Sequence, residues 1–204
     1  MTIRAGQPWG ETGQLPSDAV VVANDAAAAA AIEDARRGRR ALPALGLAGG
    51  DLCRTLGGRG DEERLRSGPA TIVPVDLGEV LVDGRLHRFV AHVVVRRGWW
   101  RGPVTAVMNA QYLGRWDVAP RAHPNDGLLD VVEVDASMGV GQRWMAWRRL
   151  SAGAHVPHPG ITVRRVAAVQ LDAAGRHVWI DGVDAGPARA LSVRVEPDAL
   201  TCAV

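Results

Sequence analysis

The residues with the clearest chemical potential lie between His123 and Val134. The first part of this stretch, His-Pro-Asn-Asp-Gly, favours a turn, because proline presets φ and glycine adopts positive φ freely. The apolar, β-prone residues from Leu128 onward predict a strand that leaves the turn. Asp126 and Asp130 would then lie at the head of the strand, on either side of the Leu128 carbonyl. Such oxygen ligands suit a hard cation such as Mg²⁺, although an Asp-Gly step also makes ordinary hairpin turns.

A second group of candidate residues follows two short apolar runs near the start of the chain. Residues 19–23 and 41–47 each predict a buried strand, and the alanine-rich segment between them predicts a helix over residues 25–37. The two strands of such a strand–helix–strand unit would be parallel. The glycine-rich loop 46–50 then enters a short helix over residues 51–56. A loop of this kind can cradle phosphate, because free N–H groups and the helix dipole both favour an anion.

The remainder of the chain predicts a β-rich region with one helix. Period-2 alternation and the Asp83-Gly84 turn are typical of antiparallel strands, which we expect over residues 71–77, 78–82, 86–96, 163–171, 175–181 and 191–195. The segment 139–154 is amphipathic and predicts a helix. The charged segment 59–66 is expected to be a linker or a short helix between the two parts.

Tryptophan and arginine occur together in two segments of this β-rich region. Trp99 and Trp100 lie in a loop among arginines, where they could meet a membrane interface or a stacked ligand, or fold back over the sheet. Trp144 and Trp147 are three residues apart and are expected near one face of the helix, with arginines such as Arg143 in water. A basic aromatic helix of this kind either packs on a sheet or lies on anionic lipid.

Composition bounds the class of protein. The chain has 204 residues, 47% hydrophobic and 23% charged, which is ordinary for a globular protein with a real core. All 24 basic residues are arginine, which excludes lysine chemistry, and the net charge of +2 is too small to favour nucleic acid. Cys53 and Cys202 lie among apolar residues and predict reduced core thiols. His155 and His158 lack a third metal ligand and are interpreted as polar loop residues. Without a signal peptide or a long apolar run, we expect a cytoplasmic protein, at most peripheral to the membrane.

The stretch from Val107 to Asp130 resembles the diacylglycerol kinase catalytic domain family, which includes bacterial lipid kinases and sphingosine kinases. In that family an asparagine and glycines precede an Ala-Pro step and a Pro-x-Asp-Asp-Gly-x-Leu-Asp-Val segment, and the matching residues here are Asn109, Gly114, Ala119-Pro120 and Pro124 to Val131. The resemblance implies an α+β fold with a small α/β remnant and a large antiparallel β-sandwich-like domain. The expected divisions are 1–68 for the reduced nucleotide-domain-like segment, 69–195 for the β-domain, and 196–204 for a terminal strand that returns to the α/β segment.

The resemblance also implies nucleotide-binding residues, which this chain keeps only in part. The residues it places near ATP are Asp25, Gly49, Gly50, Asp51 and Arg54. The family's Gly-Gly-Asp-Gly loop reads Ala23-Asn24-Asp25-Ala26 here, and the threonine of its second loop is Ala48. A Cβ at the former glycines obstructs close approach of phosphate, so ordinary ATP binding is not expected. A further strand and phosphate loop of the family are expected to be missing, because only about twenty residues precede Val20.

For catalysis and metal binding the resemblance points to three places. The family's strand ends in Asp-Gly-Glu, whose glutamate is the proposed base, and this chain reads Asp181-Gly182-Val183-Asp184. Asp181 and Asp184 are therefore the catalytic candidates; in a continuous strand Asp184 points to the opposite face from Val183 unless a bulge at Gly182 turns it back. By resemblance, the Asp126 carboxylate and the Leu128 backbone carbonyl are the candidate ligands of a Mg²⁺ ion.

Three functions remain open at this stage. The chain could be a lipid-kinase-like protein that binds a lipid or other apolar molecule with weak or no phosphate transfer, the reading that the altered loops and Val183 favour. Alternatively, it could be an active ATP-dependent diacylglycerol or sphingosine kinase with a relocated base, or a non-catalytic structural or interaction protein. Expected partners are a lipid or apolar small molecule, an anionic membrane surface and a second copy of the chain, but no nucleic acid.

Overall fold

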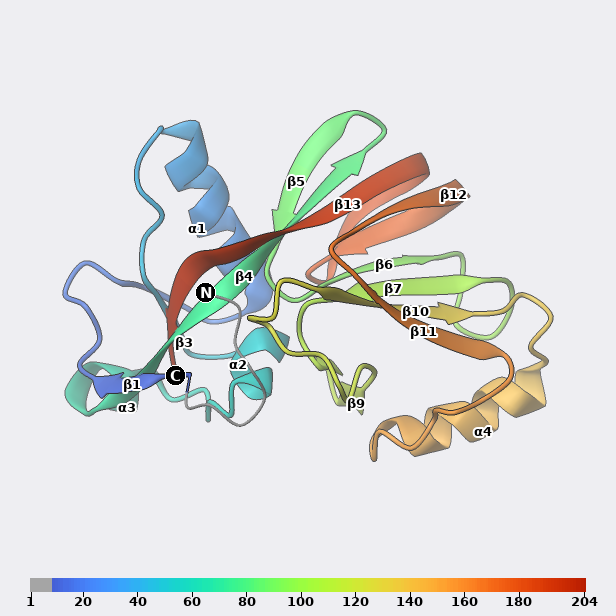
Figure 1. Cartoon of the computed structure of the whole chain (residues 1–204), viewed down its shortest axis with the longest axis horizontal. Helices are drawn as coiled ribbons and strands as arrows, with labels where there is room; N and C mark the ends of the chain where they lie inside the picture. The colour runs from blue at the N-terminus through green and yellow to red at the C-terminus, as the bar shows by residue number, and fades with distance from the viewer. Residues whose placement is uncertain (1–8) are drawn as a thin grey trace.

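The computed structural model describes residues 9–204, so the first eight residues of the expected segment 1–68 lie outside that range. The chain begins with a small α/β segment (Figure 1). Its parallel strands β2 (Val20–Val22) and β3 (Leu45–Leu47) flank helix α1 (Asp25–Arg37). Asn24 caps α1 by accepting a hydrogen bond from the N–H of Ala27 at 2.9 Å. Two short helices follow, α2 (Asp51–Thr55) and α3 (Glu62–Ser67).

The rest of the chain forms a large, strongly curved antiparallel sheet. The strands are β4 (Ala70–Val82), β5 (Arg85–Phe89), β6 (His92–Arg96), β7 (Val104–Met108), β10 (Leu129–Val134), β11 (Ile161–Val166), β12 (Ala168–Ile180) and β13 (Val183–Ala203). Their order is β1-β4-β13-β12-β6-β7-β10-β11, where β1 is Glu11–Gly13, and β5 pairs with β4. A small hairpin of β8 (Tyr112–Leu113) and β9 (Trp116–Asp117) stands apart. The predicted α+β class, with a sandwich-like β-domain, is confirmed.

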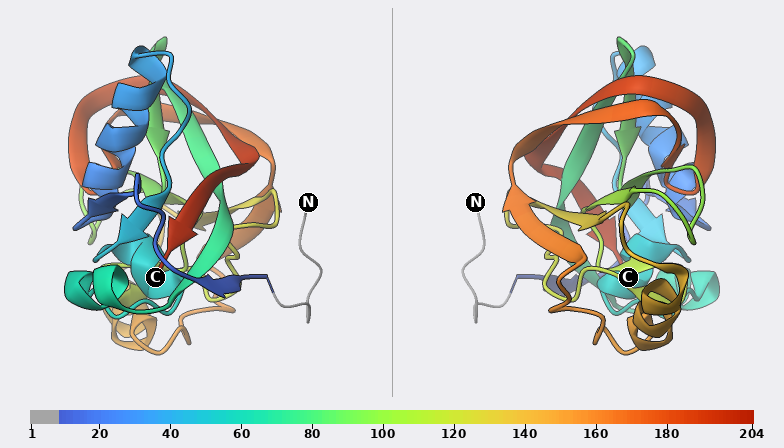
Figure 2. Two further views of the ribbon diagram at one scale, coloured as in Figure 1. Left: turned by 90° about the vertical axis from the view of Figure 1, so that its left-hand side faces the viewer. Right: turned by 90° about the vertical axis from the view of Figure 1, so that its right-hand side faces the viewer.

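The long strand β13 joins the two parts of the molecule. Most of it pairs with β12 and β4, and its last residues, Cys202 and Ala203, pair in parallel with Leu45 and Gly46 of β3. Figure 2 shows β12 and β13 curving over the remaining strands. Both cysteine thiols are free and buried in this region. The terminal strand thereby returns to the α/β segment.

Strands β6, β7 and β10 are apolar on both faces. One face, with Val93, Val107 and Val131, packs into the sandwich core against β12 and β13. The other, with Ala106 and Val132, belongs to a separate apolar cluster. Strands that bury both faces need continuous apolar sequence, which explains the run of valines in β6. The second face is covered by helix α4 (Val140–Leu150) and the β8–β9 hairpin (Figure 1).

Several local expectations are wrong. Residues 71–77 and 78–82, expected to be two antiparallel strands, form the single strand β4, and the strand expected over residues 163–171 is divided at Ala167 between β11 and β12. The strand expected over residues 86–96 is broken after Phe89, because the N–H groups of Val90 and Ala91 donate to the Asp181 carboxylate instead of to a neighbouring strand. Asp181 and Gly182 do not continue a strand; both have positive φ and form the two-residue turn between β12 and β13.

A further difference concerns the Asp126-Gly127 turn, which is not the loop of a hairpin, the alternative that its Asp-Gly step offered. The strand that leaves it, β10, pairs with β7 and β11 and not with the short strand β9 that precedes the turn. The strand itself lies where the sequence predicts it, over Leu129–Val134. None of the helices in residues 9–204 is long and apolar enough to cross a membrane.

Candidate ligand-binding site

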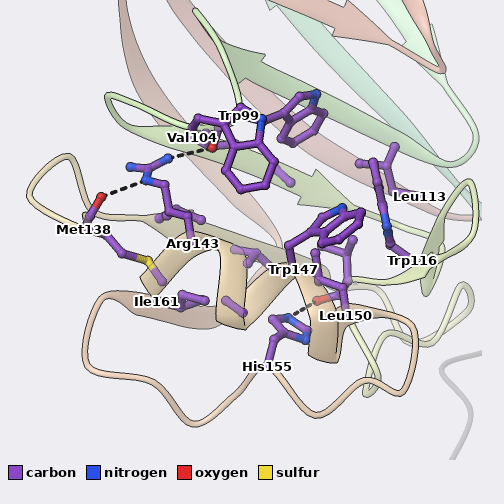
Figure 3. Close-up of a pocket in the computed structure, with 16 residues that line it drawn as sticks. Trp99, Val104, Leu113, Trp116, Met138, Arg143, Trp147, Leu150, His155 and Ile161 are labelled. Carbon is purple, nitrogen blue, oxygen red and sulfur yellow. Dashed lines mark hydrogen bonds between the residues drawn. The ribbon is translucent and has the colours of Figure 1, made fainter. Parts of the chain in front are cut away.

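The most distinctive site is an apolar cavity between α4 and the second face of β7 and β10. Its volume is about 320 Å³. The floor consists of strand side chains, including Val104, Ala106 and Val132, and the roof is Ala146, Trp147 and Leu150 of α4 (Figure 3). The helix periodicity explains the roof, because residues 143, 146, 147 and 150 recur at spacings of three and four and so share one face.

Four tryptophans line this cavity. Trp99 meets Trp116 edge to face with ring centroids 5.9 Å apart, and Trp100 lies 6.3 Å from Trp147. Arg115 lies over the Trp147 ring at 5.6 Å. The Trp99-Trp100 loop is thus neither fully extended into solvent nor folded over the sheet: each indole lines the cavity and stays about 40% exposed. The sequence left open which of these it would do.

Arg143 holds the loop and the helix together. This residue is buried, contrary to the expectation that the arginines of α4 lie in water. Its guanidinium donates to four backbone carbonyls: Met138 at 2.9 Å, Trp99 at 3.0 Å, Asp135 at 2.8 Å and Gly102 at 2.5 Å. Burial lowers the pKa of Arg143, and the nearby Asp135 opposes that shift. The guanidinium thereby fixes the tryptophan loop against the first turns of α4.

His155 brings the other polar side chain to the cavity wall. Its Nε2 lies 3.1 Å from the carbonyl oxygen of Val118, so Nε2 carries the proton and donates. Burial lowers the pKa of His155, which favours this neutral ring, although the contacts with Val118 and Asp117 work against the shift. Nδ1 is buried and has no hydrogen-bond partner among the described residues. A buried acceptor without a donor is costly to the folded state.

A polar cluster lies at the junction of the α/β segment and the β-domain. It brings together the predicted residues Asp25, Asp51 and Asp181, and adds His92, which the sequence did not single out. His92 Nε2 lies 3.0 Å from Asp51 Oδ2, and the backbone N–H of His92 donates to Asp181 Oδ1 at 2.9 Å. The Asp51 carboxylate also accepts from the N–H of Gly114.

Charge and burial shift the pKa values in this cluster. Burial raises the pKa of Asp25 to about 6, and the charges of Asp181 and Asp51 add to the shift while the N–H groups it binds oppose it. Burial also raises the pKa of Asp181, against the lowering effect of His92 and the backbone N–H groups. For His92, burial lowers the pKa, but the Asp51 hydrogen bond and the surrounding carboxylates outweigh it, so the net shift is upward.

The helix that follows the predicted phosphate loop has its first two N–H groups already bound to a carboxylate of the chain. The Asp25 carboxylate accepts from the N–H of Asp51 at 2.6 Å and from that of Leu52 at 3.1 Å, the first two residues of α2. Gly50 has φ +98°, and a Cβ there would lie 2.5 Å from Asp25 Oδ1. A Cβ at Gly49 would lie 2.4 Å from the carbonyl oxygen of Ala23. The glycines of this loop therefore make room for a carboxylate and a backbone carbonyl of the same chain.

The remaining candidates lie outside this cluster. Arg54 donates to the Gly114 carbonyl at 2.8 Å and stacks on the Tyr112 ring at 3.9 Å. Asp184 is exposed and lies 3.1 Å from His177 Nδ1, with its pKa lowered by the Gly186 N–H and by His177. The bulge that the sequence placed at Gly182 instead falls in β13, where residue 185 is skipped in the pairing with β12.

The predicted metal residues are engaged by an arginine. Asp126 Oδ1 accepts from the N–H of Leu128 at 3.0 Å, and Asp126 Oδ2 pairs with the Arg165 guanidinium. Arg165 also lies 3.7 Å from Asp130, which is 2% exposed. Both carboxylate oxygens of Asp126 are thus taken, so this arrangement fits a guanidinium and not a Mg²⁺ ion. Magnesium binding here stays a prediction, which requires displacement of Arg165.

Comparison with known proteins assigns the β-domain. Residues 78–204 match the family described as the YegS C-terminal NAD kinase beta sandwich-like domain, which is more than half of the chain. The chain belongs to this YegS-type family. The cavity lies wholly within the matched YegS-type domain, whereas the polar cluster joins that domain to the preceding α/β segment.

Three solved structures from Bacillus anthracis strain Sterne share the fold. One is described as a diacylglycerol kinase; it has a TM-score of 0.56 and 16% identity, over 79% of this chain and 66% of that one. Two provisionally assigned diacylglycerol kinases have TM-scores of 0.61 and 0.60 and identities of 16% and 13%, each over 91% of this chain and 77% of the other. A comparison with curated proteins found no match. The expected family resemblance is confirmed at the level of fold.

Sequence patterns singled out Asp25, Asp51 and Asp181 of the polar cluster in this YegS-type protein, but they did not indicate the cavity. Leu113, Trp116 and Ile161 come from separate elements, and no local pattern links them. The one available signal was the apolar character of β7 and β10 on both faces, which requires a second covering layer.

Proposed function

We propose that this YegS-type protein binds the apolar part of a lipid in the cavity beneath α4 and does not itself transfer phosphate. The observation that carries the proposal is the cavity, a space of about 320 Å³ with walls that are almost entirely apolar and aromatic. Protein interiors are close-packed, and an empty apolar space costs stability. Ligand pockets typically measure ~300–1,000 Å³, so this one suits a small apolar group.

The size of the cavity favours a single acyl chain. One water molecule occupies ~30 Å³ in the liquid. If each non-hydrogen atom of a ligand takes the same volume, the cavity holds on the order of ten such atoms. Burial of ten methylene groups would contribute about 8 kcal/mol before the cost of association is subtracted. A second chain of the same length would remain outside.

The polar side chains of the wall support a lipid with an uncharged headgroup. Burial lowers the pKa of His155, which favours a neutral ring that offers no positive charge to an acidic headgroup. The other buried polar group, Arg143, has its guanidinium committed to backbone carbonyls and offers no charge to an acidic headgroup. An alcohol therefore complements the wall better than a carboxylate does.

Three observations support the absence of phosphate transfer. The first two N–H groups of α2 are bound to the Asp25 carboxylate and are therefore not available to a phosphate. Val183, at the position of the family's proposed base, is exposed and can accept no proton. Asp181 accepts hydrogen bonds from three backbone N–H groups and is buried, so it is not available as a base.

The lipid proposal is tested with a fluorescent C11 fatty alcohol. Wild type, Ala106→Phe and Ala190→Phe are compared below the critical micelle concentration of the probe. Ala106 lines the cavity, and phenylalanine there fills it while suiting a strand; Ala190 is an exposed strand alanine and is the matched control. We expect saturable binding that Ala106→Phe weakens at least tenfold and Ala190→Phe leaves unchanged. Equal binding by all three proteins, with melting temperatures preserved, would refute the site.

The catalytic proposal is tested by labelled phosphate transfer from ATP to diacylglycerol and to sphingosine. We expect no turnover above background for wild type. Turnover that Asp184→Ala abolishes would identify an active kinase with a relocated base. Absence of both turnover and lipid binding would leave a structural or interaction role.

A further inference from the structure

The outward face of α4 carries apolar side chains that no part of the described chain covers. Val140, Trp144 and Met145 are 48%, 47% and 52% exposed. On a helix, residues four apart lie above one another, so Trp144 stands over Arg148 and Met145 over Arg149. Each of these two rows therefore runs from an apolar side chain to an exposed arginine. The Arg148 guanidinium lies 4.9 Å from the Trp144 ring, which joins the two kinds of side chain in one surface.

The tryptophan loop continues this surface. Arg143 binds the carbonyls of Trp99 and Gly102, which fixes the loop beside the first turns of α4. Trp99 and Trp100 are 39% and 43% exposed, and Arg97 and Arg101 on either side of them are exposed as well. We call the exposed side chains of this loop and of the outward face of α4 the Trp–Arg surface.

The charges of the Trp–Arg surface are all of one sign. Residues 96–104 and 136–154 contain six arginines and neither Asp nor Glu. Within residues 9–204, four of these arginines, Arg97, Arg101, Arg148 and Arg149, form no ion pair. The next acidic residue along the chain, Asp135, accepts hydrogen bonds from Ser137. Unpaired arginines with exposed tryptophan and methionine complement an anionic lipid bilayer, where indoles take the interface and guanidinium groups meet phosphate.

We propose that the Trp–Arg surface docks the protein on an anionic lipid bilayer. The same helix roofs the cavity with its inward face and meets the bilayer with its outward face. Trp99 and Trp100, which line the cavity and are partly exposed, then lie at the membrane interface, so an acyl chain reaches the cavity without crossing bulk water. Docking needs neither an occupied cavity nor any phosphate transfer.

The test is sedimentation with vesicles of phosphatidylcholine alone and of phosphatidylcholine with phosphatidylglycerol. We expect binding only to the anionic vesicles, and weaker binding as salt rises. An arginine near such a surface contributes ~1 kcal/mol, or about fivefold, so Arg148→Gln with Arg149→Gln should weaken binding roughly 25-fold. The matched control is Arg59→Gln with Arg85→Gln, which removes two exposed arginines that lie in other elements and should have no effect. Trp144→Ser with Met145→Ser removes the apolar half of the surface and should also weaken binding.

The outcomes separate docking from cavity binding. Equal binding to the two kinds of vesicle, no binding to either, or equal weakening by the two glutamine pairs would overturn the docking proposal. Ala106→Phe should lose the fatty alcohol yet keep its affinity for anionic vesicles. If wild type binds the alcohol but no vesicles, docking is wrong and the lipid site stands; if it binds anionic vesicles but not the alcohol, the reverse holds.

Discussion

The free-energy cost of burying the Asp130 carboxylate in the folded protein can be measured directly. The residue lies in β10 with 2% of its surface exposed, and burial raises the pKa of its carboxyl to about 6. Arg165 approaches only to 3.7 Å and is itself 40% exposed, so its charge is largely screened. One Asp130 oxygen, Oδ2, has no hydrogen-bond partner among the described residues. The ionised form is therefore poorly solvated in the folded state.

The expected magnitude follows from proton linkage. Because the folded-state pKa is raised, the contribution of Asp130 to stability is fully present below pH 3.8 and is lost as the pH rises to about 6. At ~1.4 kcal/mol per pH unit, the difference between the two pKa values corresponds to about 3 kcal/mol. Asp130→Asn is neutral at every pH. Because a small part of this contribution is already lost at pH 4, the stability of the variant relative to wild type should increase by about 2 to 2.5 kcal/mol between pH 4 and pH 7, whatever constant offset the lost contacts add.

The assay is urea denaturation of both proteins at several pH values across this range. Asp18→Asn, which removes an exposed carboxylate, controls for net charge. Carbon-13 NMR of the Asp130 carboxyl carbon gives the folded-state pKa independently. A free-energy difference between variant and wild type that does not change with pH would refute the reasoning, because it would mean that the carboxylate is solvated or paired in the folded state.

Three further predictions concern the same frame. Asp181→Ala leaves three buried N–H groups without an acceptor and should destabilise by more than ~3 kcal/mol in urea denaturation, whereas Asp184→Ala, at an exposed residue, should cost much less; similar losses would contradict this difference. Arg143→Ala should cost at least ~2 kcal/mol and weaken fatty alcohol binding, because four carbonyls lose their donor and the tryptophan loop its attachment. Mg²⁺ should raise the melting temperature of Arg165→Gln more than that of wild type, since the variant frees the Asp126 carboxylate; equal shifts would speak against a site there.

The predictions that held depend on local signals. Helix α1 lies over Asp25–Arg37, as the alanine-rich pattern and the Asn24 cap indicated, and β10 follows the Asp126-Gly127 turn closely. Those features depend on backbone preferences of neighbouring residues, which a sequence displays directly. The broken strand after Phe89 depends on a carboxylate 91 residues away along the chain, and no local pattern contains that information.

The cavity could not be predicted for a related reason. Trp144 and Trp147 were expected on one face of α4, but Trp147 lines the cavity and Trp144 is half exposed on the outside. Side chains three residues apart on a helix point in directions that differ by about 60°. Which of the two is buried depends on how the helix packs against the rest of the protein. Arg143 decides the seating by binding carbonyls of a distant loop. An amphipathic pattern assigns charged side chains to water by default, so the pattern could not indicate that Arg143 is buried.

The polar cluster shows how loops of this fold can keep their conformation without an external phosphate. Loops of backbone N–H groups that precede a helix attract an anion, and leaving such donors unpaired in a buried site costs free energy. Here the anions come from the chain itself: Asp25 binds the start of α2, and Asp76 binds the N–H groups of Gly127 and Asp198. A nucleotide phosphate at α2 would have to displace the Asp25 carboxylate and then lie beside it, and two anions in one buried site repel. The same contacts that stabilise the junction therefore weigh against nucleotide binding there, whereas the apolar cavity beneath α4 is the site that we propose for a ligand.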